Sequence, residues 1–249
     1  MIKIENVETC GWEAAIRGMR NPKNSWEKSD SRYCSEYGHP PIEGSCEYCP
    51  YDKMCDKSEK SMQQMYLIED NDLDLMTRLR NAGTDHRKFM RMIAVYLDIT
   101  APLYWWKEFD TYKVGTVANS CSTMHKIHAK EFTLDDFSHE HLMANCDNHE
   151  AKIYAESAMD VLARTVATLN VYRDMFLQTS DKRYWWQLIQ LLPSSFNQRR
   201  TIMLNYEVLA NIYKSRRNHK LDEWRELCEW IKTLPYSELI TGKGGPAGD

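Results

Sequence analysis

Four basic residues within five positions could bind an anion, and they are Arg216, Arg217, His219 and Lys220. Guanidinium and ammonium groups donate charge-assisted hydrogen bonds to phosphate oxygens, so the group suits a nucleotide phosphate. Arg199 and Arg200 could join it. The alternative is that these charges only complement the dipole at the end of a preceding helix.

A second group of polar residues lies earlier in the chain. The side chains of Asn119 and Ser122 can hydrogen-bond a phosphate or the edge of a pyrimidine. Lys113, just before them, could neutralise a phosphate or donate a proton. The alternatives are a polar turn for the first two residues and a solvated surface position for the lysine.

Cysteines are the third group with possible chemistry. Cys34, Cys46, Cys49 and Cys55 follow the spacing C-x11-C-x2-C-x5-C. A C-x2-C pair places two thiolates on one turn, as tetrahedral zinc requires, and four soft ligands also suit an iron–sulfur cluster. We expect a structural metal site with zinc ahead of iron–sulfur, because a small insert cannot bury its own core. Four unlinked thiols are the alternative.

The composition is that of an ordinary globular protein. The chain has 249 residues, 43% hydrophobic and 27% charged, with a net charge of -4. No polybasic tract suggests nucleic acid or a membrane surface as a partner, and no apolar window is long enough to span a bilayer. The N-terminal sequence lacks the apolar run of a signal peptide, so we expect a cytoplasmic protein with reduced thiols.

Periodicity predicts the elements that must position these groups. Alternation predicts strands at 2–7 and 94–100, and helical spacing predicts helices over 11–20, 71–82, 158–176, 202–213 and 227–234, with a further helix after Pro102. Residues 21–60 form a Cys-rich insert with few regular elements, and residues 241–249 are expected to be a disordered tail. The sequence thus predicts one mixed α/β (α+β) domain over residues 1–240.

The order and spacing of three stretches resemble the flavin-dependent thymidylate synthases. Residues 191–224 contain Pro193, then Asn205, Asn211 and Arg216 at the intervals of that family's C-terminal half, with Trp224 after them. The run DITAPLYWWKEF resembles its strand, Ala-Pro pair and aromatic helix, and AAIRGMRNP resembles its arginine-containing first helix.

The resemblance implies a small sheet wrapped by helices, often in a homotetramer, that binds dUMP and FAD and takes a one-carbon unit from a folate. By position, Arg216 would hold the nucleotide, and Asn205 and Asn211 would lie near FAD. Asn119 and Ser122 would stand for two polar residues of the substrate motif, with Arg199 and Lys113 as further substrate ligands.

The sequence departs from the family at its signature. Its R-H-R triplet is replaced by Thr111, Tyr112 and Lys113, and an expected arginine on the asparagine-containing helix is replaced by Glu207. Further losses occur at Ser120, Met124, His125 and Ile189. A phosphate site built from bidentate arginines does not survive such losses unchanged.

Two functions follow from these observations. The first is a one-carbon transferase that methylates or hydroxymethylates a dUMP-like pyrimidine nucleotide, with or without FAD. The second is a catalytically inactive nucleotide-binding or scaffold protein on the same fold, since a fold does not fix a function.

Overall fold

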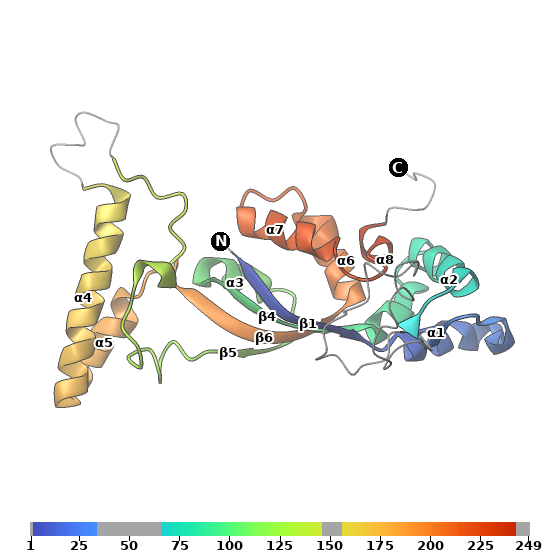
Figure 1. Cartoon of the computed structure of the whole chain (residues 1–249), viewed down its shortest axis with the longest axis horizontal. Helices are drawn as coiled ribbons and strands as arrows, with labels where there is room; N and C mark the ends of the chain where they lie inside the picture. The colour runs from blue at the N-terminus through green and yellow to red at the C-terminus, as the bar shows by residue number, and fades with distance from the viewer. Residues whose placement is uncertain (1, 34–65, 146–155, 243–249) are drawn as a thin grey trace, which may run out of the picture. The chain divides into compact units, whose positions relative to one another are not determined.

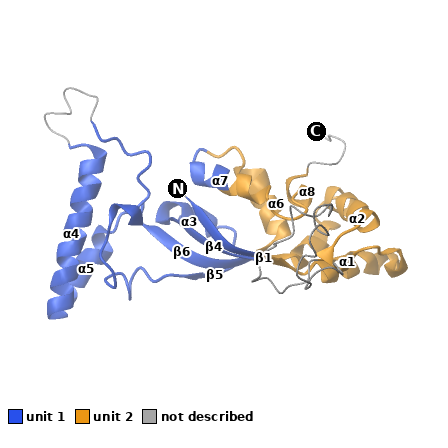
Figure 2. Cartoon of the chain, viewed as in Figure 1, with its two compact units in different colours: residues 1–7, 96–203, 220–226 blue, residues 8–95, 204–219, 227–249 orange. Residues whose placement is uncertain are grey.

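The structure is a computed structural model that describes residues 2–33, 66–145 and 156–242. Contacts within the chain divide it into two compact units, shown in Figure 2. Unit 1 comprises residues 1–7, 96–203 and 220–226, and unit 2 comprises residues 8–95, 204–219 and 227–249. No helix in the described part of the chain is long and apolar enough to cross a membrane.

A four-stranded sheet has the order β1-β4-β6-β5 (Figure 1). Its strands are β1 (Lys3–Cys10), β4 (Ala94–Pro102), β5 (Val117–Ser120) and β6 (Asn197–Asn205). Along β4 the alternating Val95, Leu97 and Ile99 are buried, as the sequence predicts, while Tyr96 is exposed. β5 pairs antiparallel with β6, and Asn119 lies opposite Thr201. This register places the side chains of Asn119 and Thr201 on the same face of the sheet, and those of Ser120 and Arg200 on the other.

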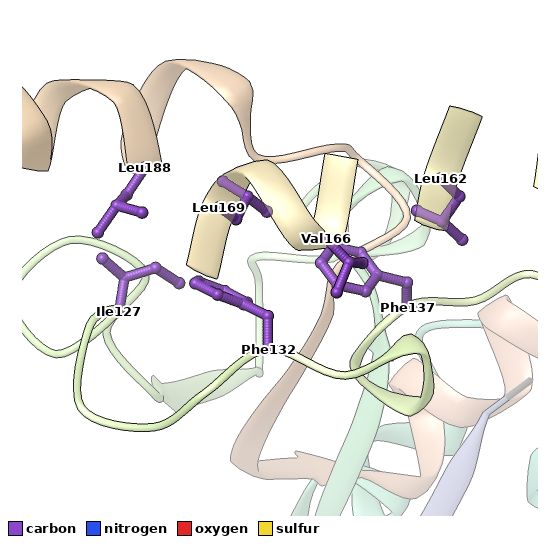
Figure 3. Packing of buried hydrophobic residues seen from close by; sticks show 7 residues of the cluster. All are labelled: Ile127, Phe132, Phe137, Leu162, Val166, Leu169 and Leu188. Carbon is purple, nitrogen blue, oxygen red and sulfur yellow. The ribbon is translucent and has the colours of Figure 1, made fainter. Parts of the chain in front are cut away.

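Unit 1 contains a helical hairpin formed by α4 (Ala158–Thr179) and α5 (Lys182–Leu191). Ser157 caps α4 by accepting a hydrogen bond from the backbone N–H of Asp160, and Asp181 caps α5 in the same way. Side chains from both helices and the preceding loop form an apolar cluster (Figure 3). Its members are Ile127, Phe132, Phe137, Leu162, Val166, Leu169 and Leu188.

Aromatic residues form the other packed region of unit 1. Trp105 and Trp106 of α3 (Leu103–Phe109) are buried and their ring centroids lie 4.8 Å apart. Trp224, from α7 (Asp222–Ile231), packs on Trp105 with centroids 4.8 Å apart. Trp105 and Trp106 are therefore core residues of unit 1, whereas Trp186 of α5 is 44% exposed.

Unit 2 is built mainly from helices. They are α1 (Trp12–Arg20), α2 (Asp70–Asn81), α6 (Tyr206–Arg216), α8 (Glu238–Thr241) and the short 3-10 helices Asn21–Lys23, Trp26–Lys28 and Arg87–Met92. Gly11 precedes α1 with φ 92°, and a Cβ there would lie 2.0 Å from the carbonyl oxygen of Met92. Only glycine fits this turn, because any side chain would collide with backbone.

A buried ion pair joins α1 to α2. Arg20 donates from Nε to Asp72 Oδ1 over 2.6 Å, and both side chains are almost fully buried. The other guanidinium nitrogens of Arg20 donate to the carbonyl oxygens of Ser25 and Lys28. Asp72 also accepts hydrogen bonds from the Ser29 hydroxyl and two backbone N–H groups. Arg20 thus fixes the chain where it leaves α1.

Two sequence predictions are revised by the structure. The helix predicted over 202–213 begins at Tyr206, and Ile202 lies in β6, where Ile202 and Leu204 are buried with the period of a strand. Thr241, taken as the start of the tail, ends α8. Of the insert, residues up to Tyr33 are described: β2 (Arg32–Tyr33) pairs with β3 (Tyr66–Leu67).

Candidate functional site

A polar network in unit 1 is centred on the Asp98 carboxylate. Asp98 Oδ2 accepts hydrogen bonds from Asn6 Nδ2 over 2.7 Å and from Arg199 Nη2 over 2.6 Å, and Oδ1 accepts one from the Thr201 hydroxyl. Hydrogen bonding, first from Thr201 and then from Arg199 and Asn6, lowers the pKa of Asp98 to about 2. Arg199, predicted to bind substrate, is therefore held by a carboxylate that stays ionised at neutral pH.

Asn119 lies beside this network. It is exposed on β5 opposite Thr201, and it is a diagonal cross-strand neighbour of Arg199 on the same face. The structure thus brings together two of the predicted substrate residues. Arg200 does not join them, because its guanidinium bonds Asp110 and stacks on the Trp106 ring at 4.2 Å from the centroid.

Ser122 and Lys113 occupy the loops on either side of β5. The Ser122 hydroxyl accepts hydrogen bonds from the backbone N–H groups of Met124 and His125, over 3.2 Å and 2.8 Å. This is the polar turn considered as an alternative, although the hydroxyl proton remains able to donate to a ligand. Lys113 is exposed in the turn after α3.

The other three predicted residues belong to α6 in unit 2. Asn205 is the N-cap of the helix, and its side-chain oxygen accepts from the backbone N–H of Val208 over 3.1 Å. Asn211 is exposed and accepts from Arg87 Nη2 over 3.0 Å. Arg216 is half-buried at the C-terminal end of the helix. Asn205 therefore has a structural role, because an asparagine at the N-cap stabilises the start of the helix.

Sequence reasoning missed one group in unit 2. Arg87 and Arg91, from the 3-10 helix Arg87–Met92, both form ion pairs with Glu207 of α6. The signal in the sequence was the loss of an arginine at position 207, which left a carboxylate in a place where the resemblance expects a cation. Only the structure shows which cations surround it.

A hollow of about 650 Å³ in unit 2 contains none of the predicted site residues. Its lining is mostly polar and comprises Arg20, Lys23, Ser25, Lys28, Asn71, Asp74, Leu75 and Arg78. Arg20 is already bonded to Asp72, and Arg78 pairs with Asp74. We assign it no part in the candidate site.

The predicted metal ligands Cys34, Cys46, Cys49 and Cys55 lie outside the described residues. Within residues 2–33, 66–145 and 156–242, no three His, Cys, Asp or Glu side chains are close enough to share a metal ion. The metal site therefore stays a prediction about the segment between β2 and β3.

The Asp98 network makes stability depend on pH. Because the folded pKa of about 2 lies below the roughly 3.9 of an unfolded aspartate, the network stabilises the fold above about pH 4, and this contribution is lost as the pH falls toward 2. We expect Asp98→Asn to be less stable than the parent at neutral pH and to lose less stability between pH 4 and 2. Urea unfolding across that range tests this, and parallel curves would contradict it.

Comparison with known proteins relates this geometry to a fold. The sequence matches no protein-family model and no curated protein sequence. Among solved structures, flavin-dependent thymidylate synthase ThyX from Helicobacter pylori, complexed with FAD and dUMP, is similar with a TM-score of 0.58 and 14% identity over 96% of this chain and 98% of that one. The UMP/dUMP methylase PolB from Streptomyces cacaoi, bound with 5-Br dUMP, has a TM-score of 0.56 and 13% identity over 98% and 96%. The chain therefore has the mixed α/β fold of the flavin-dependent thymidylate synthases.

Proposed function

We propose that the protein is a diverged thymidylate synthase-like enzyme that transfers a one-carbon group, methyl or hydroxymethyl, to the base of a dUMP-like nucleotide. The observation that carries this proposal is the shared fold over nearly the whole chain, together with Asn211 and Arg216 at the intervals of the family on α6. Both similar structures are described with a uridine nucleotide or its bromo analogue bound.

The residues divide by chemistry into two groups. In unit 1, Asn119 offers both amide donors and an amide acceptor to a pyrimidine edge, Ser122 offers a hydroxyl proton, and Lys113 and Arg199 supply positive charge. Asp98 orients Arg199 and is a positioning residue. In unit 2, Arg216 would hold the nucleotide phosphate.

FAD is the proposed cofactor and a folate the proposed one-carbon donor. The exposed amide of Asn211 and the arginines beside it fit an anionic, hydrogen-bonding cofactor. When bound, FAD would supply the hydride that reduces the transferred group. The chain's own residues would bind and orient the two rings.

Titration calorimetry with dUMP and FAD, each added to the purified full chain, tests the binding part of this proposal. We expect both to bind. Failure of both to bind would refute the proposal. Binding of dUMP by a chain that shows no turnover would instead support the inactive nucleotide-binding protein, which the replacement of the R-H-R triplet by Thr111, Tyr112 and Lys113 favours.

We further propose a homo-oligomer that uses the outer face of α4. Val161, Thr168, Val171 and Met175 follow one another at steps of seven, three and four residues, which places them on one face of the helix as in a coiled-coil seam. Val171 is 58% exposed, and the Thr168 hydroxyl already donates to the Arg164 carbonyl oxygen over 2.8 Å. The hydroxyl proton of Thr168 is therefore already bonded within the helix, so burial of this threonine would not leave it unpaired.

Val171→Glu is expected to lower the molar mass measured by light scattering after size exclusion, because a charge in a packed apolar seam is costly to bury. Leu177→Glu is the matched control, since Leu177 is 51% exposed on the same helix but lies outside the seam. An unchanged mass for Val171→Glu, or equal effects of both substitutions, would contradict an interface on this face.

A further inference from the structure

Glu207 holds two guanidinium groups side by side. Its Oε1 accepts from Arg87 Nε over 3.4 Å and from Arg91 Nη2 over 3.3 Å, and its Oε2 accepts from Arg91 Nε. The Glu207 and Arg87 side chains are only 12% and 18% exposed, whereas Arg91 is 54% exposed. Glu207 thus pairs with one mostly buried arginine, Arg87, and with one exposed arginine, Arg91.

The charges in this group do not cancel. One carboxylate faces two guanidinium groups, so the three side chains carry a net charge of about +1 at neutral pH. Asp85 adds a weaker negative influence on Arg91, while Lys88 lies in the same 3-10 helix. A single arginine would be enough for an ion pair that only holds this 3-10 helix against α6.

Donors remain available on this group. Arg87 Nη2 donates to Asn211 Oδ1 over 3.0 Å, which leaves the amide nitrogen of Asn211 as a neighbouring donor. Among the described residues, Nη1 of Arg87 and Nη1 of Arg91 have no hydrogen-bond partner. Several N–H groups of fixed orientation and net positive charge therefore lie together.

The residue type at position 207 bears on the role of Arg87 and Arg91. The resemblance expects an arginine there, and this chain has a carboxylate instead. The Glu207 carboxylate pairs with two arginines from a different element, residues 87–92. Positive charge therefore lies beside the start of α6, although the residue on α6 itself is negative. A lost arginine on α6 is thereby replaced by two on its neighbour.

We infer that Arg87 and Arg91, positioned by Glu207 and joined by Asn211, form an oxyanion-binding site for a phosphate of a nucleotide ligand. This inference rests on the proposed function for the identity of the ligand. The shared chemistry is a phosphate that accepts bidentate hydrogen bonds, and it is supplied either by FAD or by the pyrimidine nucleotide. Contact of Arg87 with Asn211, the residue expected near FAD, favours FAD.

Calorimetric titration of the full chain with FAD, dUMP and inorganic pyrophosphate in separate experiments tests the site. For Arg91→Gln we expect about 10- to 100-fold weaker binding of the phosphate ligand, as loss of a hydrogen bond to a charged group implies. Its melting temperature should barely change, because exposed ion pairs contribute little to stability. Arg78→Gln is the control: its side chain is 66% exposed in the same unit and pairs with Asp74.

The possible outcomes test the oxyanion site and the proposed function independently. If the parent binds FAD or dUMP and Arg87→Gln and Arg91→Gln bind as tightly as the control, the site is wrong and the proposed function stands. If the parent binds pyrophosphate, the arginine variants lose it and neither nucleotide binds, the oxyanion site stands and the proposed function is wrong. If the parent binds none of the three, both are overturned. Weakening by Arg78→Gln equal to that by Arg91→Gln would show general charge attraction and would also overturn the site.

Discussion

Arg20→Ala is expected to destabilise the protein by about 3–5 kcal/mol, because it leaves a buried carboxylate without its counter-ion. Asp72 is fully buried and accepts from Arg20 Nε over 2.6 Å. Urea unfolding followed by circular dichroism measures the loss. Arg17→Ala is the matched control from the same helix: Arg17 is 67% exposed and pairs with Glu13 at 3.7 Å, so its removal should cost under about 1 kcal/mol.

The stability that the Arg20–Asp72 pair contributes is expected to fall as the pH is lowered. Burial raises the pKa of Asp72, but the hydrogen bonds from Ser31, Ser29 and Arg20 outweigh it and hold the pKa below its usual value. The stabilisation is therefore present above the unfolded pKa of about 3.9 and is lost as the pH falls through the folded value. Equal costs for Arg20→Ala and Arg17→Ala at neutral pH would contradict this account of the junction between α1 and α2.

Arg216→Gln is expected to weaken dUMP binding by about 10- to 150-fold, as removal of a charged hydrogen-bond donor to phosphate implies. Arg216 ends α6 and is half-buried, five residues after Asn211. Calorimetry with dUMP gives the affinity, and the melting temperature shows whether the variant remains folded. Lys214→Gln, exposed in the same last turn, is the control for a general loss of positive charge.

Arg216→Lys distinguishes the effect of positive charge from that of bidentate hydrogen bonding. A lysine keeps the charge that complements the helix dipole but cannot form a bidentate pair with a phosphate. We expect Arg216→Lys to bind dUMP more weakly than the parent. If Arg216→Lys and Arg216→Gln both bind as tightly as the parent, Arg216 serves the helix end alone.

Strong periodicity made part of the fold predictable. The alternation of Val95, Leu97 and Ile99 identified β4, and the helical spacing over 71–82 identified α2 (Asp70–Asn81) to within a residue. β5 escaped prediction because Val117–Ser120 is exposed along its whole length and therefore shows no alternation. The sequence predicts a helix from residue 202 because the apolar residues at the end of β6 lead directly into α6, with only Asn205 as the boundary.

The predicted site residues show the limit of local reasoning more clearly. Asn119 and Arg199 are 80 positions apart in sequence, and only the β5–β6 register makes them neighbours. The cation group on Glu207 depends on arginines more than a hundred residues earlier. Arg20 has the appearance of an ordinary charge at a helix end, and its burial against Asp72 is a tertiary contact that no local pattern records.

Mass spectrometry of the nucleotide tests the central claim most directly. The full chain, prepared without oxygen, would be incubated with dUMP, chemically reduced FAD and methylenetetrahydrofolate, and the nucleotide then analysed. The account predicts a dUMP product that has gained a methyl or a hydroxymethyl group on the base. Unmodified dUMP from protein that demonstrably binds dUMP and FAD would contradict one-carbon transfer and identify the protein as a nucleotide-binding protein on an enzyme's fold.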